Sequence, residues 1–284
     1  MSSVSLTAGS IHYDRSGPAD GRPIVFIHGY AMGRSLWRPV IERLSARGFD
    51  CLAPTWPLGA HTEAMNEGAD LSMEGVAATV AELLEALDLD DVVLVGNDTG
   101  GAIAQLVAVG TPERLGALVL TSCDAFEHFP PPILKPLIAA AKVPPAFAAA
   151  LQPMRTRFGR KRAYGALAHA DIDHLASEWI EPALTDSRVR EDLRRFTASL
   201  TRETTVAAGA RLPEFAKPAL VAWSADDAFF PLEDGERLVA ALPDARLEVV
   251  SGARTFSMID RPDVLAELIA EFTGARARAR AGSA

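Results

Sequence analysis

One short segment constrains the fold of this chain more than any other. Residues 92–95 form an uninterrupted apolar run of the kind found in buried parallel strands, and the sequence GNDTGG follows at residues 96–101. Residues 102–106 then have a helical pattern. Glycines on both sides of Asp98 permit a strained turn that packs tightly against neighbouring backbone. A strand, a sharp turn and a helix in this order lift the Asp98 side chain above the sheet, where helix-end amides stabilise negative charge.

The rest of the chain alternates strand-like and helical runs, the pattern of a parallel sheet covered by helices on both faces. The alternation stops at residue 128, where a segment of short, proline-punctuated helical runs begins. We therefore predict an α/β core at residues 1–127 and 213–273. Residues 128–212 are predicted to form a helical lid (cap) over the carboxyl ends of the strands. The Ala- and Arg-rich residues 274–284 are predicted to be a disordered tail.

Composition limits the kinds of partner. The formal net charge of -9 would repel nucleic acid and anionic membranes. The first residues have neither a basic nor an apolar signal-peptide region, and two cysteines do not resemble a secreted disulfide scaffold. The sequence shows no metal-ligand cluster and no dinucleotide fingerprint. We expect a cytoplasmic, cofactor-independent protein, a monomer or homodimer, that acts on a small molecule.

Three landmarks together resemble the α/β-hydrolase family. The first is the GNDTGG turn, which matches the nucleophile elbow G-x-S-x-G with Asp98 in the serine position. The second is FIHGY at residues 26–30, which matches the H-G motif after the third strand, and the third is WSADDAFFP at residues 223–231, which matches the turn that holds the acid of the catalytic triad. The resemblance implies an α/β-hydrolase fold: a mostly parallel eight-stranded sheet with helices on both faces and a helical lid insertion.

Within the family, an aspartate in the elbow resembles the branch of haloalkane dehalogenases and epoxide hydrolases. That resemblance implies Asp98 as nucleophile, Asp227 as supporting acid, and the backbone amides of Tyr30 and Thr99 as the oxyanion hole. Asp124 occupies an alternative acid position that some relatives use. A carboxylate is already ionised at neutral pH, so it can displace halide or open an epoxide and form an enzyme-bound ester that water then hydrolyses.

The chain departs from the family where a catalytic histidine is expected. The position after the last strand is occupied by Thr255, which cannot act as a base near neutral pH, and no histidine follows His174. Two other histidines are candidates: His61, on the loop after the strand at residues 50–55, and His128, at the lid entrance. His28 belongs to the H-G motif, where a structural role is usual.

The subfamily and the leaving group stay open. Dehalogenases of this branch have tryptophan directly after the nucleophile, where this chain has Thr99. Epoxide hydrolases use lid tyrosines as acids, and Tyr164 is the lid tyrosine here, with a packing role as the alternative.

We therefore expect a hydrolase that cleaves a carbon–heteroatom bond (halide, epoxide or ester) of a small apolar substrate. One alternative is a lyase or isomerase with Asp98 as general base, and another is a catalytically impaired ligand-binding homologue.

Overall fold

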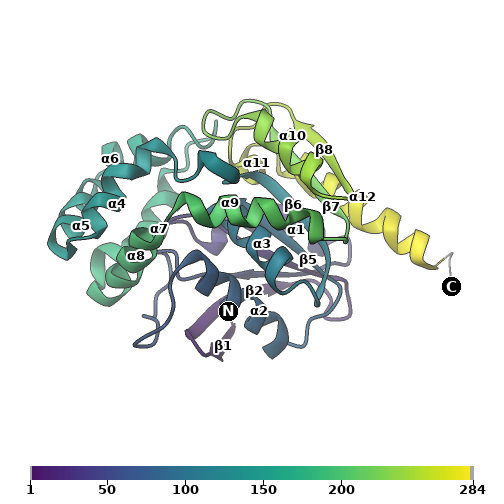
Figure 1. Cartoon of the computed structure of the whole chain (residues 1–284), viewed down its shortest axis with the longest axis horizontal. Coiled ribbons are helices and arrows are strands. Elements are labelled where there is room, and N and C mark those ends of the chain that lie inside the picture. The colour runs from purple at the N-terminus through teal and green to yellow at the C-terminus, as the bar shows by residue number, and fades with distance from the viewer. Residues whose placement is uncertain (1, 282–284) are drawn as a thin grey trace.

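The computed structural model describes residues 2–281 of the chain. Its centre is an eight-stranded sheet with the strands Ser2–Leu6 (β1), Gly9–Ser16 (β2), Pro23–Ile27 (β3), Asp50–Pro54 (β4), Val92–Asp98 (β5), Leu115–Cys123 (β6), Ala219–Ser224 (β7) and Ala245–Val250 (β8). Their order across the sheet is β1-β2-β4-β3-β5-β6-β7-β8 (Figure 1). β1 pairs antiparallel with β2, β2 pairs antiparallel with β4, and the other neighbours are parallel. This is the mostly parallel sheet that the alternating pattern predicts.

Helices cover the sheet and form the segment inserted between β6 and β7. The α-helices are Arg38–Ser45 (α1), Met73–Ala86 (α2), Thr99–Gly110 (α3), Lys135–Ala141 (α4), Pro144–Leu151 (α5), Arg157–Tyr164 (α6), Asp173–Thr185 (α7), Ser187–Ser199 (α8), Arg202–Arg211 (α9), Leu232–Ala241 (α10), Ser257–Asp260 (α11) and Pro262–Ala281 (α12). Short 3-10 helices lie at Arg34–Trp37 (η1), Phe126–His128 (η2), Pro132–Leu134 (η3), Gln152–Arg155 (η4) and Leu212–Glu214 (η5).

The central strands contribute to apolar layers on both faces of the sheet, because successive side chains of a strand point to opposite sides. In β3, Val25 and Ile27 belong to the layer that α2 and α3 cover. Ile24 and Phe26 belong to the layer that α1 and α12 cover. All four side chains are fully buried, which explains why the sequence of this strand is apolar without alternation.

The strand register determines where Asp98 lies. Ile27, the last residue of β3, is opposite Gly96 of β5, and Asp98 itself is opposite Cys123 of β6. Because the carboxyl ends of parallel strands share one edge of the sheet, the segments that follow β3, β5, β6 and β7 meet there. Asp98 therefore lies at the centre of that edge.

The inserted helices lie at one end of the sheet. α4 to α8 form a group at the left of Figure 1. Side chains of α4, α5, α7 and α8, among them Phe147, Ile180 and Leu193, form a small apolar cluster together with Ala31. In contrast, α9 lies against α3 of the core. The predicted boundaries of a separate lid at residues 128–212 stay a prediction.

The prediction of a disordered tail at residues 274–284 stays a prediction. α12 continues without a break to Ala281, and residues 282–284 lie outside the described residues. The segment consists mainly of alanine and arginine, which are among the strongest helix formers, so a preceding helix extends through it at little cost.

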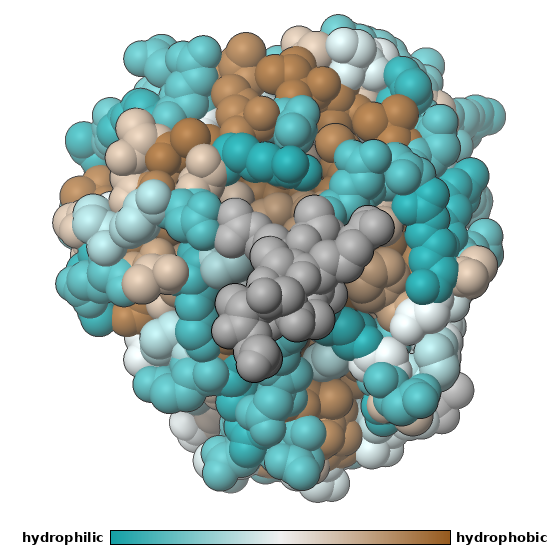
Figure 2. Space-filling view, turned by 90° about the vertical axis from the view of Figure 1, so that its right-hand side faces the viewer, coloured by the Kyte–Doolittle hydropathy of each residue, from teal (hydrophilic) through white to brown (hydrophobic). Residues whose placement is uncertain are grey.

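The face at the right-hand side of Figure 1 carries hydrophilic residues over much of its area, with hydrophobic residues gathered near the top (Figure 2). β8 is an edge strand, and its Val249 is 46% exposed. No helix in the described part of the chain combines the length and the apolar composition that a membrane crossing requires.

Candidate active site

The turn between β5 and α3 places Asp98 in a strained conformation. Its φ is 54° and its ψ is -135°, in a region that non-glycine residues rarely occupy. The flanking glycines allow this turn because backbone comes very close to them. A Cβ at Gly100 would lie 2.5 Å from the carbonyl oxygen of His28, and one at Gly96 would lie 2.6 Å from that of Gly100. The geometry is that of the predicted elbow.

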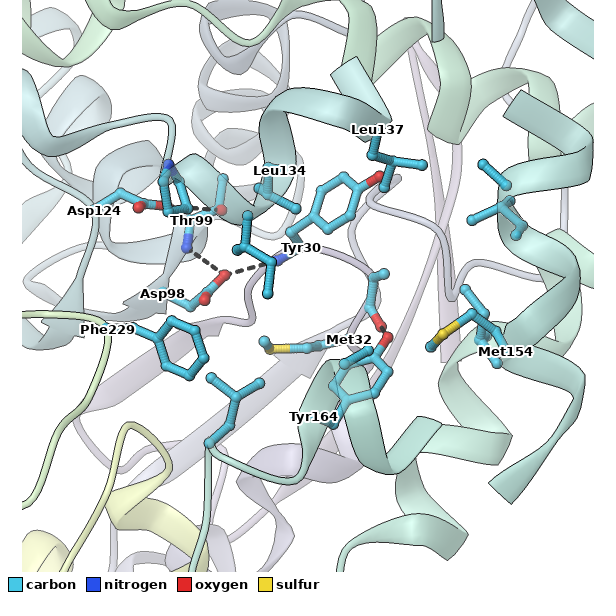
Figure 3. Close-up of a pocket in the computed structure, with 18 of the residues that line it drawn as sticks. Tyr30, Met32, Asp98, Thr99, Asp124, Leu134, Leu137, Met154, Tyr164 and Phe229 are labelled. Carbon is cyan, nitrogen blue, oxygen red and sulfur yellow. Dashed lines mark hydrogen bonds between the residues drawn. The ribbon is translucent and has the colours of Figure 1, made fainter. Parts of the chain in front are cut away.

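Two backbone amides hold one oxygen of the Asp98 carboxyl group. Oδ1 accepts hydrogen bonds from the amide of Thr99 at 2.7 Å and from that of Tyr30 at 3.1 Å. Figure 3 shows both donors converging on Asp98 at the edge of a cavity. A Cβ at Gly29 would lie 2.2 Å from Oδ1, so the residue before Tyr30 has to be glycine for this approach. The two amides expected in an oxyanion hole thus contact the side chain of Asp98 itself.

The second oxygen of Asp98, Oδ2, is in a different position. No hydrogen bond to it is found among residues 2–281, and the residue contributes to the cavity wall. Burial raises the pKa of Asp98 and the negative charge of Asp227 raises it further, while the amides of Thr99 and Tyr30 and the nearby hydroxyl of Thr99 lower it. The arrangement therefore presents one carboxyl oxygen, without a hydrogen-bond donor, toward the cavity.

Asp124, which follows β6, lies beside Asp98 and lines the same cavity. The hydroxyl of Thr99 donates to its Oδ2 at 2.9 Å. Burial raises the pKa of Asp124 well above its usual range, and the charge of Asp98 raises it further. Thr99 thus links the two carboxyl groups, its amide to one and its hydroxyl to the other (Figure 3). The sequence suggested Asp124 as an alternative acid but gave no sign of this link.

Asp227 lies in the turn after β7, and backbone and side-chain donors fix its position. Its Oδ1 accepts from the amides of Phe229 at 2.8 Å and Phe230 at 3.0 Å, and from the hydroxyl of Thr255 at 3.0 Å. Burial raises its pKa, and the two amides oppose that shift. Thr255 is itself fully buried, and the side chain of Asn97 donates to its carbonyl oxygen at 3.0 Å. The structure therefore places Thr255 against the predicted acid.

The structure places His61 in contact with Asp192 of α8 and not with Asp98. Its Nε2 lies 3.2 Å from Oδ2 of Asp192, an oxygen that also accepts from the amide of Met65. His61 is 3% exposed and is not part of the cavity wall. This geometry gives no support to its predicted catalytic role. The sequence places His61 on a loop after a strand, but it does not show which helix the side chain contacts.

The remaining candidates divide between structural contacts and the cavity. Nε2 of His28 accepts from the amide of Trp56 at 2.9 Å, and burial lowers the pKa of this histidine to about 4, so the ring is neutral and structural. His128 pairs through Nδ1 with Asp234 at 2.8 Å and is half exposed. Tyr164 does line the cavity, but its hydroxyl donates to a backbone carbonyl, that of Ala31, at 2.7 Å.

The cavity itself has a volume of about 240 Å³ and lies between the elbow and the inserted helices. Most of its wall is apolar. Among the described residues that form it, none is lysine, arginine, histidine or tryptophan. Apolar side chains contribute from the segments that follow the core strands and from the segment inserted between β6 and β7, among them Met32, Leu134, Leu137, Leu151, Met154, Leu167 and Phe229.

A metal centre has no basis in the described residues, where no three His, Cys, Asp or Glu side chains are grouped as metal ligands would be. The prediction that the protein works without a cofactor stays a prediction.

Comparison with known proteins supports the assignment of the fold. The family described as alpha/beta hydrolase fold matches residues 22–262. Among solved structures, the crystal structure of DbjA superposes with a TM-score of 0.79 at 17% identity, over 97% of this chain and 99% of that one. The enol-lactonase from Burkholderia xenovorans superposes with a TM-score of 0.73 at 20% identity, over 96% of this chain and 100% of that one. These matches confirm the predicted fold class.

Sequence relatives point to hydrolases of another kind than expected. The chain is 26% identical over 278 residues to the 2-hydroxy-6-oxononadienedioate/2-hydroxy-6-oxononatrienedioate hydrolase of Cupriavidus pinatubonensis, covering 93% of this chain and 90% of that protein. It is 28% identical over 279 residues to hydrolase 1 of the same description from Pseudomonas putida, covering 93% and 91%. These names describe neither a haloalkane dehalogenase nor an epoxide hydrolase, so the narrower resemblance stays a prediction.

Proposed function

Because this chain belongs to the α/β-hydrolase fold family, we propose that it is a hydrolase that uses the Asp98 carboxylate to cleave a carbon–heteroatom bond of a small apolar substrate. One observation carries this proposal. Oδ1 of Asp98 is held by two backbone amides, whereas Oδ2 has no hydrogen-bond donor and lies at the cavity. An anionic oxygen that is desolvated and oriented in this way is a competent nucleophile.

The chemistry follows from the two different oxygens. Oδ2 attacks an sp³ carbon, the bond to the leaving group breaks, and an ester of Asp98 forms. Oδ1 then becomes the carbonyl oxygen of that ester, still in contact with the amides of Thr99 and Tyr30. When water attacks the ester carbon, negative charge develops on Oδ1, and both donors stabilise it. The same amides therefore serve the resting carboxylate and the hydrolytic step.

The cavity wall supports an uncharged, apolar substrate. Its volume of about 240 Å³ suits a small molecule, and no cationic side chain of the described residues is available to bind a substrate carboxylate. Asp98 and Asp124 would instead repel an anion. The names of the sequence relatives describe dicarboxylate substrates. Because of the cavity wall, we propose that the substrate of this chain is uncharged and differs from theirs in this respect.

The test is intact-mass spectrometry after incubation with neutral alkyl bromides and epoxides. We expect a mass increase on the peptide that contains Asp98: the alkyl group in place of a hydrogen for a bromide, and the whole mass of the epoxide for an epoxide. Asp98→Asn keeps the size of the side chain but removes the nucleophile, and should lower adduct formation by at least about a thousandfold. Asp226→Asn, at an exposed carboxylate in the same turn as Asp227, is the matched control and should react like the unmodified protein. If no compound of the panel gives either an adduct or a product, the proposal is excluded.

A second candidate, a lyase or isomerase with Asp98 as general base, is favoured by one observation. No histidine of the described chain lines the cavity, so Asp98, whose pKa burial raises, is a candidate for the base. Turnover in ¹⁸O-labelled water separates the two candidates. Label in the product or in Asp98 requires hydrolysis of an ester, whereas conversion without label supports the lyase or isomerase.

A further inference from the structure

Two carboxyl groups line the cavity, those of Asp98 and Asp124, and the proposed function gives a role only to Asp98. We infer that Asp124 donates a proton to the leaving oxygen, so that the site selects substrates whose carbon–oxygen bond opens to an alkoxide, such as epoxides, over organic halides. This inference rests on the proposed nucleophilic role of Asp98.

The placement of Asp124 carries the first step. Its side chain is buried, forms part of the cavity wall, and is linked to Asp98 through one residue, Thr99. Oδ2 of Asp124 accepts from the hydroxyl of Thr99, and no hydrogen bond to its other oxygen is found among residues 2–281. Figure 3 shows the two carboxyl groups on either side of Thr99 at the same side of the cavity. Both carboxyl groups therefore border the cavity in which a substrate carbon attacked by Asp98 would lie.

The two carboxyl groups differ in how well they hold negative charge. Asp98 has two amide donors, whereas Asp124 has one hydroxyl donor. Two neighbouring buried carboxylates do not both ionise readily, because each charge disfavours the other. The charge therefore resides on Asp98 and the proton on Asp124, which is the division of roles that a nucleophile and an acid require.

No other side chain of the described cavity wall is free to assist a leaving group. The hydroxyl of Tyr164 donates to the carbonyl of Ala31. Thr197 donates its own hydroxyl hydrogen to the carbonyl of Leu193 at 2.6 Å, so the 2.6 Å contact between the hydroxyls of Tyr30 and Thr197 is donated by the tyrosine. With no tryptophan or cationic side chain in the described wall, a departing halide would find no donor, whereas an alkoxide would find the proton of Asp124.

The steps balance in atoms and charge. Oδ2 of Asp98 forms a bond to an epoxide carbon, the carbon–oxygen bond breaks, and the oxygen takes the proton from Asp124. The pair keeps one negative charge, which has moved from Asp98 to Asp124. Water then adds to the ester carbon, the alcohol leaves with one proton, and the second proton returns to Asp124. Asp124 is thus acid in the first step and base in the second, which supplies the base that the chain lacks at Thr255.

The test compares two neutral substrates with the same carbon chain, n-hexyl bromide and the epoxide of hexene, on the unmodified protein and on Asp124→Asn. The variant should lower the rate of epoxide opening by about 10²–10⁴-fold, while alkylation of Asp98 by the bromide changes by less than about tenfold. Asp226→Asn is the matched control for a lost carboxylate. An equal loss for both substrates, or an unchanged epoxide rate, overturns the inference.

A second measurement does not depend on the variant. On the unmodified protein, the ratio of epoxide to bromide rates should fall as pH rises, because Asp124 loses its proton while Asp98 stays nucleophilic. A ratio independent of pH overturns the inference even if Asp124→Asn fails to fold. If the bromide alkylates Asp98 but the epoxide does not react, the inference fails and the proposed function stands. If neither substrate modifies Asp98, both fail.

Discussion

The hydroxyl of Thr255 donates a 3.0 Å hydrogen bond to Oδ1 of Asp227. In the family that this chain resembles, the acid at this turn orients a histidine. Here Asp227, the predicted acid, contacts a threonine, which has no basic nitrogen. The acid turn is therefore intact, with three donors on one carboxyl oxygen, although the group that it would normally support is absent.

Replacing Thr255 with histidine should restore a base. Because Thr255 already contacts Asp227, an imidazole at this position can be oriented by the same carboxylate, and the lifetime of the Asp98 ester formed from n-hexyl bromide should fall by about a hundredfold. The decay of the adduct mass measures this. Thr255→Val, which removes the hydroxyl without adding a base, should not shorten the lifetime. An unchanged lifetime in folded Thr255→His would mean that this position does not correspond to the family's histidine.

The buried pair of His61 and Asp192 should contribute to stability and not to chemistry. His61→Gln removes the imidazole that contacts Asp192, the only side chain found to hydrogen-bond with Asp192 among the described residues. The substitution should lower the free energy of unfolding by about 1–3 kcal/mol. Alkylation of Asp98 should change by less than about twofold, because the pair is not part of the cavity wall. Denaturant unfolding and adduct formation are measured on the same sample. His169→Gln, in an exposed pair, is the control. If His61→Gln abolishes alkylation while the free energy of unfolding is unchanged, His61 takes part in the reaction and this prediction is wrong.

The stability gained from Asp124→Asn should depend on pH in one direction. The folded-state pKa of Asp124 is raised above the ordinary 3.8, so the native state keeps a proton that the unfolded state releases. The proton of Asp124 therefore contributes a loss of stability as pH rises from about 3.8 toward the folded pKa, and the asparagine variant lacks this contribution. Urea unfolding at several pH values should show the advantage of Asp124→Asn growing over this interval and then levelling off. An advantage that shrinks with pH would contradict the raised pKa.

Substrate charge should affect the reaction strongly. A bromide that carries a terminal carboxylate should alkylate Asp98 at least about tenfold more slowly than the neutral bromide of equal length. The reason is that the buried Asp98 and Asp124 repel it and no cationic side chain of the described wall compensates. Competition between the two bromides, read by mass, measures the ratio directly. Equal rates, or faster reaction of the carboxylated compound, would show that an anion-binding group reaches the cavity.

Local sequence was sufficient to predict the sheet core and the turn that carries Asp98. Apolar runs of strand length predicted the parallel strands, and the GNDTGG segment predicted the turn that carries Asp98. These features depend on periodicity and on residues a few positions apart, which sequence displays directly.

For the Ala- and Arg-rich tail, composition alone does not say whether a preceding helix continues. Residues 274–281 would be marginal as an isolated helix, but they extend α12, which has already nucleated. Helix length at a chain end thus depends on what the segment is attached to.

The sequence by itself therefore determined the α/β alternation, the strained turn at Asp98 and the acid turn at Asp227, because short-range backbone preferences and strand burial specify them. Only the tertiary structure decided which side chains surround the nucleophile. It brought Asp124 to Thr99 across 25 residues and His61 to Asp192 across 131. Contacts of this kind depend on strand register and on how the inserted helices pack, and no local pattern in the chain encodes either.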